Sequence, residues 1–251
     1  MSMTLYHGEP NGPSFTVLAA LFEKGLQADL VRIGLAEGAR HELPCAQQPE
    51  VAMSVEGEGP VLLVDAEAMT DSVFIACYLD DVGQGAPLRP TNPYGRWEMM
   101  TWCRQMIERT APAAALLGCH AHPPKASPAI LAKIDSADLR LRWEMIGAGV
   151  FADDKLADSR AKLTAAVEKL EARLDGRNWL IGEFTIADLE SYAWLAGMVN
   201  VVPEAFKGKK LTMAWMQGVK VRPAVGKALA LAKVADPTAY WAPGPEINRW
   251  G

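Results

Sequence analysis

The stretch that decides the fold is residues 59–72, Gly-Pro-Val-Leu-Leu-Val-Asp-Ala-Glu-Ala-Met-Thr-Asp-Ser. Its apolar run at 61–64 predicts a buried strand, and the polar residues after it predict a turn into a second short strand. Asp71 and Ser72 then lie where a helix needs an N-cap, and apolar side chains continue through Leu79. The stretch therefore predicts a hairpin of two strands that leads directly into a helix.

The residues before this stretch predict a strand, a helix and another strand. Residues 4–6 are a short apolar strand candidate, and the loop of Gly, Pro and Asn after them ends at Ser14, where a helix N-cap is expected. Apolar residues at helical spacing continue that helix until Gly25 closes it. Charged and aliphatic residues alternate over 29–33, as in a half-exposed strand. Residues 1–83 thus predict a small α/β domain.

The rest of the chain is predicted to be helical. Residues 84–95, rich in Gly and Pro, are interpreted as a linker, and residues 96–251 as an all-helical domain. The four residues Thr185-Ile186-Ala187-Asp188 form a capping box at the start of an apolar helix through Met198. The other expected helices cover 95–117 with an interruption at Pro112, 128–146, 153–174, 212–221 and 223–232. The fold class is therefore α+β, with a small α/β domain followed by an all-helical one.

Composition excludes several classes of function. The 251 residues include 25 basic and 30 acidic side chains, a net charge of -5, which argues against nucleic-acid binding. The four cysteines form no Cys-x-x-Cys pair, and Cys119 with His120 and His122 lacks a second cluster, so no metal site is expected. No apolar run is long enough to cross a membrane, and the N-terminal residues lack a signal-peptide pattern. We therefore expect a soluble, cytoplasmic protein.

Four features, in this order, resemble the glutathione transferase superfamily. They are the first loop with Ser14, Pro60 before the strand at 61–64, the Asp71-Ser72 pair, and the 185–188 capping box after Trp179-Leu180-Ile181-Gly182. Two stretches, the first loop through Ser14 with the segment 21–25 and the segment 139–174, are also similar to the bacterial branch that cleaves lignin-type β-aryl ethers. The resemblance implies a thioredoxin-like glutathione-binding domain, a helical domain with a second-substrate pocket and a C-terminal tail, and a cis peptide bond at Pro60.

The resemblance implies that Ser14 and Asn11 are the catalytic residues. A hydroxyl at a helix N-terminus can donate to the sulfur of bound glutathione, while the helix dipole favours the thiolate, the form that attacks carbon. Asn11 in the same loop is a second candidate donor, and Tyr6 in the first strand is a less favoured one. The structural alternatives are a plain N-cap for Ser14 and a turn residue for Asn11.

Five residues are implied to bind glutathione: His41, Gly59, Pro60, Asp71 and Ser72. The helix that begins at Ser72 offers amides and positive potential to the γ-glutamyl carboxylate, Ser72 adds a hydroxyl, and Asp71 can pair with the ammonium group. A cis bond at Pro60 presents the backbone of Gly59 to the cysteinyl part. His41 is the candidate donor to the glycyl carboxylate. The alternatives are a simple helix cap and an ordinary loop-to-strand Gly-Pro.

Two acidic residues depart from the family pattern. Glu56 and Glu58 precede Pro60, and a carboxylate that faces the glycyl carboxylate of glutathione would repel it by about 1 kcal/mol when solvated. Two functions therefore stay open. One is a β-etherase-type transferase that uses glutathione as co-substrate on a small aromatic electrophile, a β-aryl ether ketone. The other is a catalytically weak or inactive structural subunit of a heterodimeric transferase; the family's dimers allow a homodimer or a heterodimer.

Overall fold

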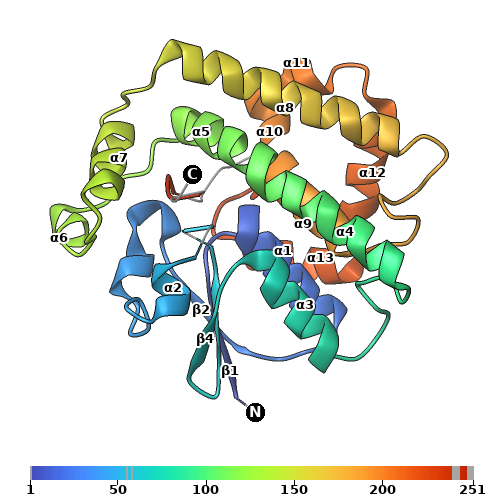
Figure 1. The fold of residues 1–251 in the computed structure, drawn as a ribbon, viewed down its shortest axis with the longest axis horizontal. Coiled ribbons are helices and arrows are strands. Elements are labelled where there is room, and N and C mark those ends of the chain that lie inside the picture. Colours follow the sequence, from blue (N-terminus) through green and yellow to red (C-terminus); the bar gives the residue numbers. More distant parts are fainter. Residues whose placement is uncertain (1, 55, 58, 239–243, 248–251) are drawn as a thin grey trace.

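Figure 1 shows the fold in a computed structural model, which describes residues 2–54, 56–57, 59–238 and 244–247. Four strands form one mixed sheet in the order β2-β1-β3-β4, and they are β1 (Met3–His7), β2 (Asp29–Arg32), β3 (Val61–Val64) and β4 (Glu67–Met69). Strand β1 runs parallel to β2 and antiparallel to β3, so that Leu5 pairs with Leu30 on one side and with Leu62 on the other. The predicted hairpin of β3 and β4 is confirmed.

Two helices of the N-terminal part, α1 (Gly12–Glu23) and α3 (Ser72–Val82), pack against each other. Helix α1 is buried from Gly12 to Leu21 because it also packs against two helices of the second half of the chain, α9 (Ile186–Leu195) and α13 (Pro223–Leu229). Between β2 and β3 the chain forms only short elements, which are η1 (Leu35–Glu37), η2 (Ala39–Glu42) and α2 (Pro49–Ala52).

The rest of the described chain is helical, as predicted. Helices α4 (Pro93–Gln105) and α5 (Ala111–Ala121) are joined by one π-helical turn, η3 (Met106–Thr110). Pro112 lies in the first turn of α5 and lacks an N–H, so the turn before it widens instead of keeping the regular hydrogen bonds. The other helices are α6 (Pro128–Leu131), α7 (Ala137–Gly147), α8 (Asp153–Arg173), α9 (Ile186–Leu195), α10 (Met198–Val201), α11 (Pro203–Phe206), α12 (Lys210–Lys220) and α13 (Pro223–Leu229).

The single helix predicted over 128–146 is wrong, because α6 and α7 are separate helices. The hydroxyl of Ser136 accepts the N–H of Leu139 at 3.3 Å and so caps a new helix where the prediction continued an old one. Ile134, between the two helices, is buried in a small apolar cluster with Leu139 and Trp143. This cluster holds the chain at the break.

The capping box at the start of α9 is confirmed. The N–H of Thr185 donates to Oδ2 of Asp188 at 2.9 Å. The other oxygen of Asp188 accepts from the N–H of Leu180 at 3.1 Å and from the indole N–H of Trp215 at 2.9 Å. Burial raises the pKa of Asp188 to about 6, although these hydrogen bonds oppose the shift. One carboxylate thus ties the start of α9 to α12 and to the preceding loop.

The connection between α3 and α4 is fixed by Asp80. Its carboxylate pairs with Lys24 at 3.0 Å and with Arg89 at 2.8 Å, and it accepts the N–H of Leu88 at 2.9 Å. The side chains of Lys24 and Asp80 are buried. The carbonyl of Leu88 in turn accepts the N–H of Ile186 at 2.9 Å. The connecting segment is therefore bonded both to the N-terminal part and to the start of α9.

One apolar core runs through the N-terminal and the helical parts of the molecule, and Phe15 of α1 lies 4.9 Å from Tyr192 of α9 between ring centres. Ile247 near the C-terminus belongs to the same core. In Figure 1 the red C-terminal segment accordingly lies between α5 and the blue N-terminal part. Among the described residues, no helix is long and apolar enough to span a membrane.

Candidate functional site

Ser14 lies within the first turn of α1, not at its N-cap. The helix begins at Gly12 with Pro13 in its first turn, and Asn11 holds the N-cap position, so the predicted N-cap role of Ser14 is wrong. A proline in the first turn starts the helix early, because its φ is already helical and its missing N–H is not needed there. The Ser14 hydroxyl is buried and accepts the N–H of Gly8 at 2.9 Å. No acceptor for its own proton lies within hydrogen-bond distance among the described residues, so that proton is available to a ligand.

Asn11 faces the C-terminal part of the chain. Its side-chain amide donates to the carbonyl of Pro237 at 3.3 Å, and the residue is buried. Its side chain does not cap α1, although the residue holds the N-cap position. The structure therefore places both predicted catalytic residues at the start of α1.

Asp71 precedes α3, but its side chain does not cap the helix. Its φ of 66° is in the left-handed region, and its carboxylate turns back to accept from the hydroxyl of Ser54 at 2.7 Å and from the N–H of Glu56 at 3.1 Å. The first N–H of α3, that of Ser72, donates instead to Oε2 of Glu56 at 2.7 Å, and the Ser72 hydroxyl bonds the other oxygen of Glu56. The cap of α3 is thus the carboxylate of Glu56, which the sequence analysis had named only as a source of repulsion.

A second buried acid, Glu190 of α9, reaches the same place. Its Oε2 lies 3.0 Å from the Ser72 hydroxyl and 2.8 Å from the Thr16 hydroxyl, and its Oε1 accepts from the indole of Trp194. Burial raises the pKa of both Glu56 and Glu190, and for Glu56 the neighbouring carboxylates of Glu190 and Asp71 add to the shift. The Ser72 hydroxyl has one proton for two carboxyl groups, so its second contact requires a proton on one of them.

Gly59 and Pro60 lie next to this acid cluster, and the peptide bond between them is trans. No peptide bond in the described part of the chain is cis, so the cis bond implied at Pro60 is wrong. The trans form is the lower in free energy for an ordinary X-Pro bond, by about 0.5–1 kcal/mol. Gly59 leaves room for the cluster: a side chain there would come within 2.8 Å of the Glu56 carboxylate.

His41, on η2, does bind a carboxylate, but it is one of this chain. Its Nε2 is bonded to Oε1 of Glu246, and the indole N–H of Trp143 donates to the same oxygen at 2.7 Å. Glu246 is 1% exposed. Glu246 and His41 are 205 residues apart in the sequence, which is why no local pattern could have joined them.

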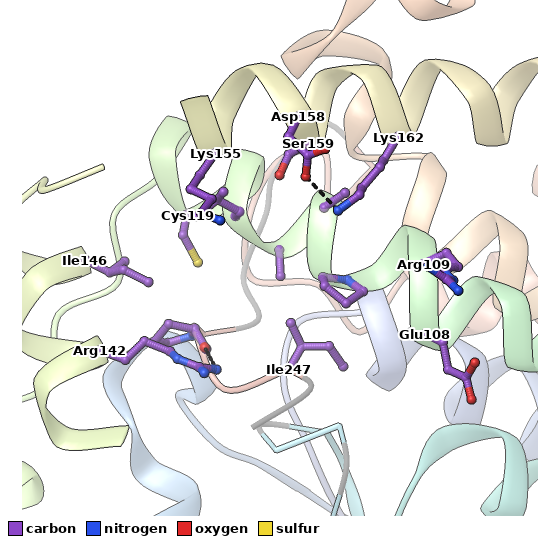
Figure 2. A pocket seen from close by; sticks show the side chains of 15 residues that line it. Glu108, Arg109, Cys119, Arg142, Ile146, Lys155, Asp158, Ser159, Lys162 and Ile247 are labelled. Carbon is purple, nitrogen blue, oxygen red and sulfur yellow. Dashed lines mark hydrogen bonds and ion pairs between the residues drawn. The ribbon is translucent and has the colours of Figure 1, made fainter. Parts of the chain in front are cut away.

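A large cavity opens on the other side of segment 244–247. It has a volume of about 670 Å³ and is enclosed by α5, α7, α8 and the C-terminal segment (Figure 2). Its apolar lining comes from Pro112, Ala113, Ala115, Leu116, Ile146 and Ile247. Three cationic side chains, those of Arg109, Arg142 and Lys155, border it and have no carboxylate within ion-pair distance in the described ranges, whereas Lys162 pairs with Asp158 at 2.6 Å.

The donor groups fit glutathione in kind. Glutathione carries one thiol and two carboxylates, and the chain offers a hydroxyl proton at Ser14, a helix start at Ser72, and two N–H donors at His41 and Trp143. Two of these three groups are already bonded to carboxylates of the chain itself, Glu56 and Glu246. The loop of Glu56 and Gly57 lies against Glu246, so the donors at Ser72 and at His41 are close to each other. Both are occupied by carboxylates of the chain.

These features define the class of protein. A four-stranded mixed sheet with α1 and α3, followed by a helical part that packs on α1, is the fold of glutathione transferases, with a thioredoxin-like N-terminal domain. Glutathione transferase F7 from Populus trichocarpa superposes with a TM-score of 0.65 at 23% identity, covering 90% of this chain and 99% of that one. A glutathione S-transferase from Methylobacillus flagellatus KT, solved with glutathione bound, superposes with a TM-score of 0.68 at 18% identity, covering 90% and 98%.

Within that class, the chain is similar to LigF from Sphingobium sp. (strain NBRC 103272 / SYK-6). The two sequences are 26% identical over 255 residues, which span 94% of this chain and 96% of LigF. The crystal structure of the β-etherase LigF superposes with a TM-score of 0.79 at 24% identity, over 92% of this chain and 99% of LigF. The resemblance to the superfamily, close to its β-etherase branch, is confirmed, while no protein-family model matches the sequence.

Proposed function

We propose that the chain is a glutathione transferase of the β-etherase type, which acts on an aromatic β-aryl ether ketone. The observation that carries the proposal is the Ser14 hydroxyl, which accepts the Gly8 N–H at the positive end of a buried helix and whose own proton has no acceptor among the described residues. The similarity to LigF over nearly the full length of both chains supports the same activity.

The proposed reaction is a displacement at the carbon next to the ketone. Glutathione supplies the thiolate sulfur: the C–S bond forms, the C–O bond to the aryloxide breaks, and the aryloxide leaves with the electron pair and takes a proton from solvent. Ser14 donates a hydrogen bond to the sulfur, and the N-terminus of α1 favours its anionic form. Glutathione is consumed, and the products are a thioether and a phenol.

The cavity beside segment 244–247 supports an aromatic second substrate. Its apolar walls from α5 and α7 suit a ring, and the cations of Arg142 and Lys155 stabilise negative charge on a departing aryloxide. Figure 2 shows Arg142 and Lys155 on opposite sides of Cys119 and Ile146 at one end of the cavity.

We also propose that the chain works as a dimer, either with a second copy or with a related subunit. Phe74 of α3 and Tyr94 and Trp97 of α4 are each more than half exposed. Phe74 and Trp97 line a second cavity of about 490 Å³. An apolar surface that combines the N-terminal and the helical part suits a partner chain.

One observation favours the alternative, a weak or inactive subunit of a heterodimer. Glu56 and Glu246 occupy the groups that would bind the two carboxylates of glutathione. A subunit that keeps this arrangement would not bind glutathione and would leave catalysis to its partner chain.

Product analysis tests the proposed function. Incubation with glutathione and a β-aryl ether ketone should yield the glutathione thioether and the free phenol in equal amounts by mass spectrometry. Ser14→Ala should lower kcat by about 10- to 100-fold, because the thiolate loses a hydrogen bond of about 1.5–3 kcal/mol. The control Ser127→Ala removes an exposed hydroxyl at α6 and should leave kcat unchanged. If the purified chain forms no thioether, the proposed transferase activity of the chain alone is contradicted, and the alternative of an inactive subunit of a heterodimer is favoured.

A further inference from the structure

The carboxylate of Glu246 sits in a site built for a carboxylate. His41 and Trp143 both contact Oε1 of Glu246, and Trp143 does so at 2.7 Å. The Glu246 backbone lies against Gly57, where any side chain would come within 2.7 Å of the Glu246 carbonyl oxygen. Gly57 has a φ of 64°, a backbone conformation that favours glycine, and its lack of a side chain leaves room for the Glu246 backbone.

The segment around Glu246 is buried and makes both polar and apolar contacts. Arg142 donates to the carbonyl of Pro245 at 3.4 Å, a weak bond, and Ile247 is the segment's member of the apolar core. A different carboxylate that replaced Glu246 would restore the hydrogen bonds of His41 and Trp143. The exchange would therefore replace these two hydrogen bonds and would cost the burial of segment 244–247.

The donor group at the start of α3 is also occupied by a carboxylate of the chain. Glu56 receives the N–H and the hydroxyl of Ser72, at the start of α3. A ligand with two carboxylates thus meets two carboxylates of the chain. Glu56 belongs to the loop before β3, whereas Glu246 belongs to segment 244–247 near the C-terminus.

We propose that segment 244–247 is an internal competitor of glutathione, in which Glu246 holds the His41 and Trp143 donors and glutathione binds only after the segment has left. The inference rests on the proposed function. A tethered group acts at a millimolar effective concentration, so a competitor of this kind lowers apparent affinity without any separate inhibitor. In the described arrangement the His41 and Trp143 donors are thus closed to glutathione, and they become available when Glu246 leaves.

The test compares the affinity for reduced glutathione in three forms of the full protein by calorimetry. Glu246→Gln removes the charge that His41 and Trp143 bind, and a chain that ends at residue 243 removes the whole segment. Both should bind glutathione at least tenfold more tightly than the wild type. The control is Glu42→Gln, which makes the same change of charge next to His41 at a half-exposed ion pair with Lys133; it should bind like the wild type.

A second readout follows the segment itself. When glutathione displaces Glu246 from the wild type, the indole of Trp143 exchanges its acceptor, and its fluorescence should change with the same apparent Kd as the calorimetry. In the chain that ends at residue 243 the starting fluorescence should already differ from that of the wild type. Trp143→Phe should abolish this component of the signal.

The outcomes separate the two proposals. If the wild type and both variants bind glutathione equally, the competitor role is overturned and the proposed function stands. If both variants bind more weakly than the wild type, segment 244–247 is part of the binding site, and the competitor role is again overturned. If none of the three forms binds glutathione, the proposed function fails, and the competitor role fails with it.

Discussion

A buried carboxylate accepts a backbone N–H at the start of α9 and at the start of α3, yet the two carboxylates differ in origin and in surroundings. At α9 the acid is Asp188, from the helix's own first turn, and three N–H donors surround it. At α3 the acid is Glu56, from a loop 16 residues before Ser72, and it shares a hydroxyl with a second acid, Glu190. At α9 three N–H groups donate to the single carboxylate of Asp188. At α3 the carboxylates of Glu56 and Glu190 share the hydroxyl of Ser72. We therefore expect the loss of the Asp188 carboxylate to cost more stability than the loss of the charge on Glu56.

The largest effect is expected at α9. Asp188→Ala would leave the N–H groups of Leu180 and Thr185 and the indole of Trp215 buried without an acceptor, which should lower the free energy of unfolding by about 3–5 kcal/mol. Urea denaturation measures this. The control Asp138→Ala, at an exposed position in the first turn of α7, should cost less than about 1 kcal/mol. If Asp188→Ala lowered the free energy of unfolding as little as Asp138→Ala, Asp188 would not be a structural cap, and the distinction between α9 and α3 would fail.

A smaller and opposite effect is expected at α3. Glu56 holds its proton more tightly in the folded than in the unfolded chain, because burial and the nearby acids raise its pKa above the ordinary value of 4.5. Its contribution to stability is therefore complete below pH 4.5 and is lost as the pH rises through the raised pKa. Glu56→Gln keeps the neutral form, so its stability should exceed that of the wild type by on the order of 1 kcal/mol at alkaline pH.

Urea midpoints between pH 4.5 and pH 9 test this difference. Glu67→Gln, at an exposed position on β4, is the matched control and should follow the wild type at every pH. If Glu56→Gln lost stability at all pH values, as Asp188→Ala is expected to do, Glu56 would be a structural cap, and the distinction between α3 and α9 would fail.

The smallest effect is expected on ligand binding in the cavity beside segment 244–247, which is bordered by the cations of Arg109, Arg142 and Lys155. Lys155→Met should weaken the binding of 8-anilinonaphthalene-1-sulfonate, an aromatic anion, by roughly three- to fivefold, because a cation a few ångströms away in water contributes about 1 kcal/mol. Binding of the uncharged N-phenyl-1-naphthylamine should not change. The exposed Lys220→Met, on α12, is the control. Equal losses for the charged and the neutral probe would mean that Lys155 contributes packing instead of charge.

The same pair of helix starts shows how much a sequence can predict. The capping box from Thr185 to Asp188 is four residues long, so its hydrogen bonds follow from local spacing, and the hairpin of β3 and β4 follows likewise. The cap of α3 could not be predicted, because Glu56 reaches Ser72 only through the path of the loop before Pro60. The contact of His41 with Glu246 joins the two ends of the chain and leaves no local pattern. For residues as distant in the sequence as His41 and Glu246, only the folded structure shows which acid binds which donor.

The bonds made by Asp80 have a consequence for how a ligand enters. Hinged enzymes open by rotating two bodies about a few free connecting residues. Here the connection is bonded to Lys24, at the C-cap of α1, to Arg89 and Leu88 within itself, and through Leu88 to α9. Helix α1 also packs against α9 and α13, so a rotation of the N-terminal part against the helical part would break both this packing and the bonds of the connection. We therefore expect ligand entry to involve short segments and not a rotation of the two parts.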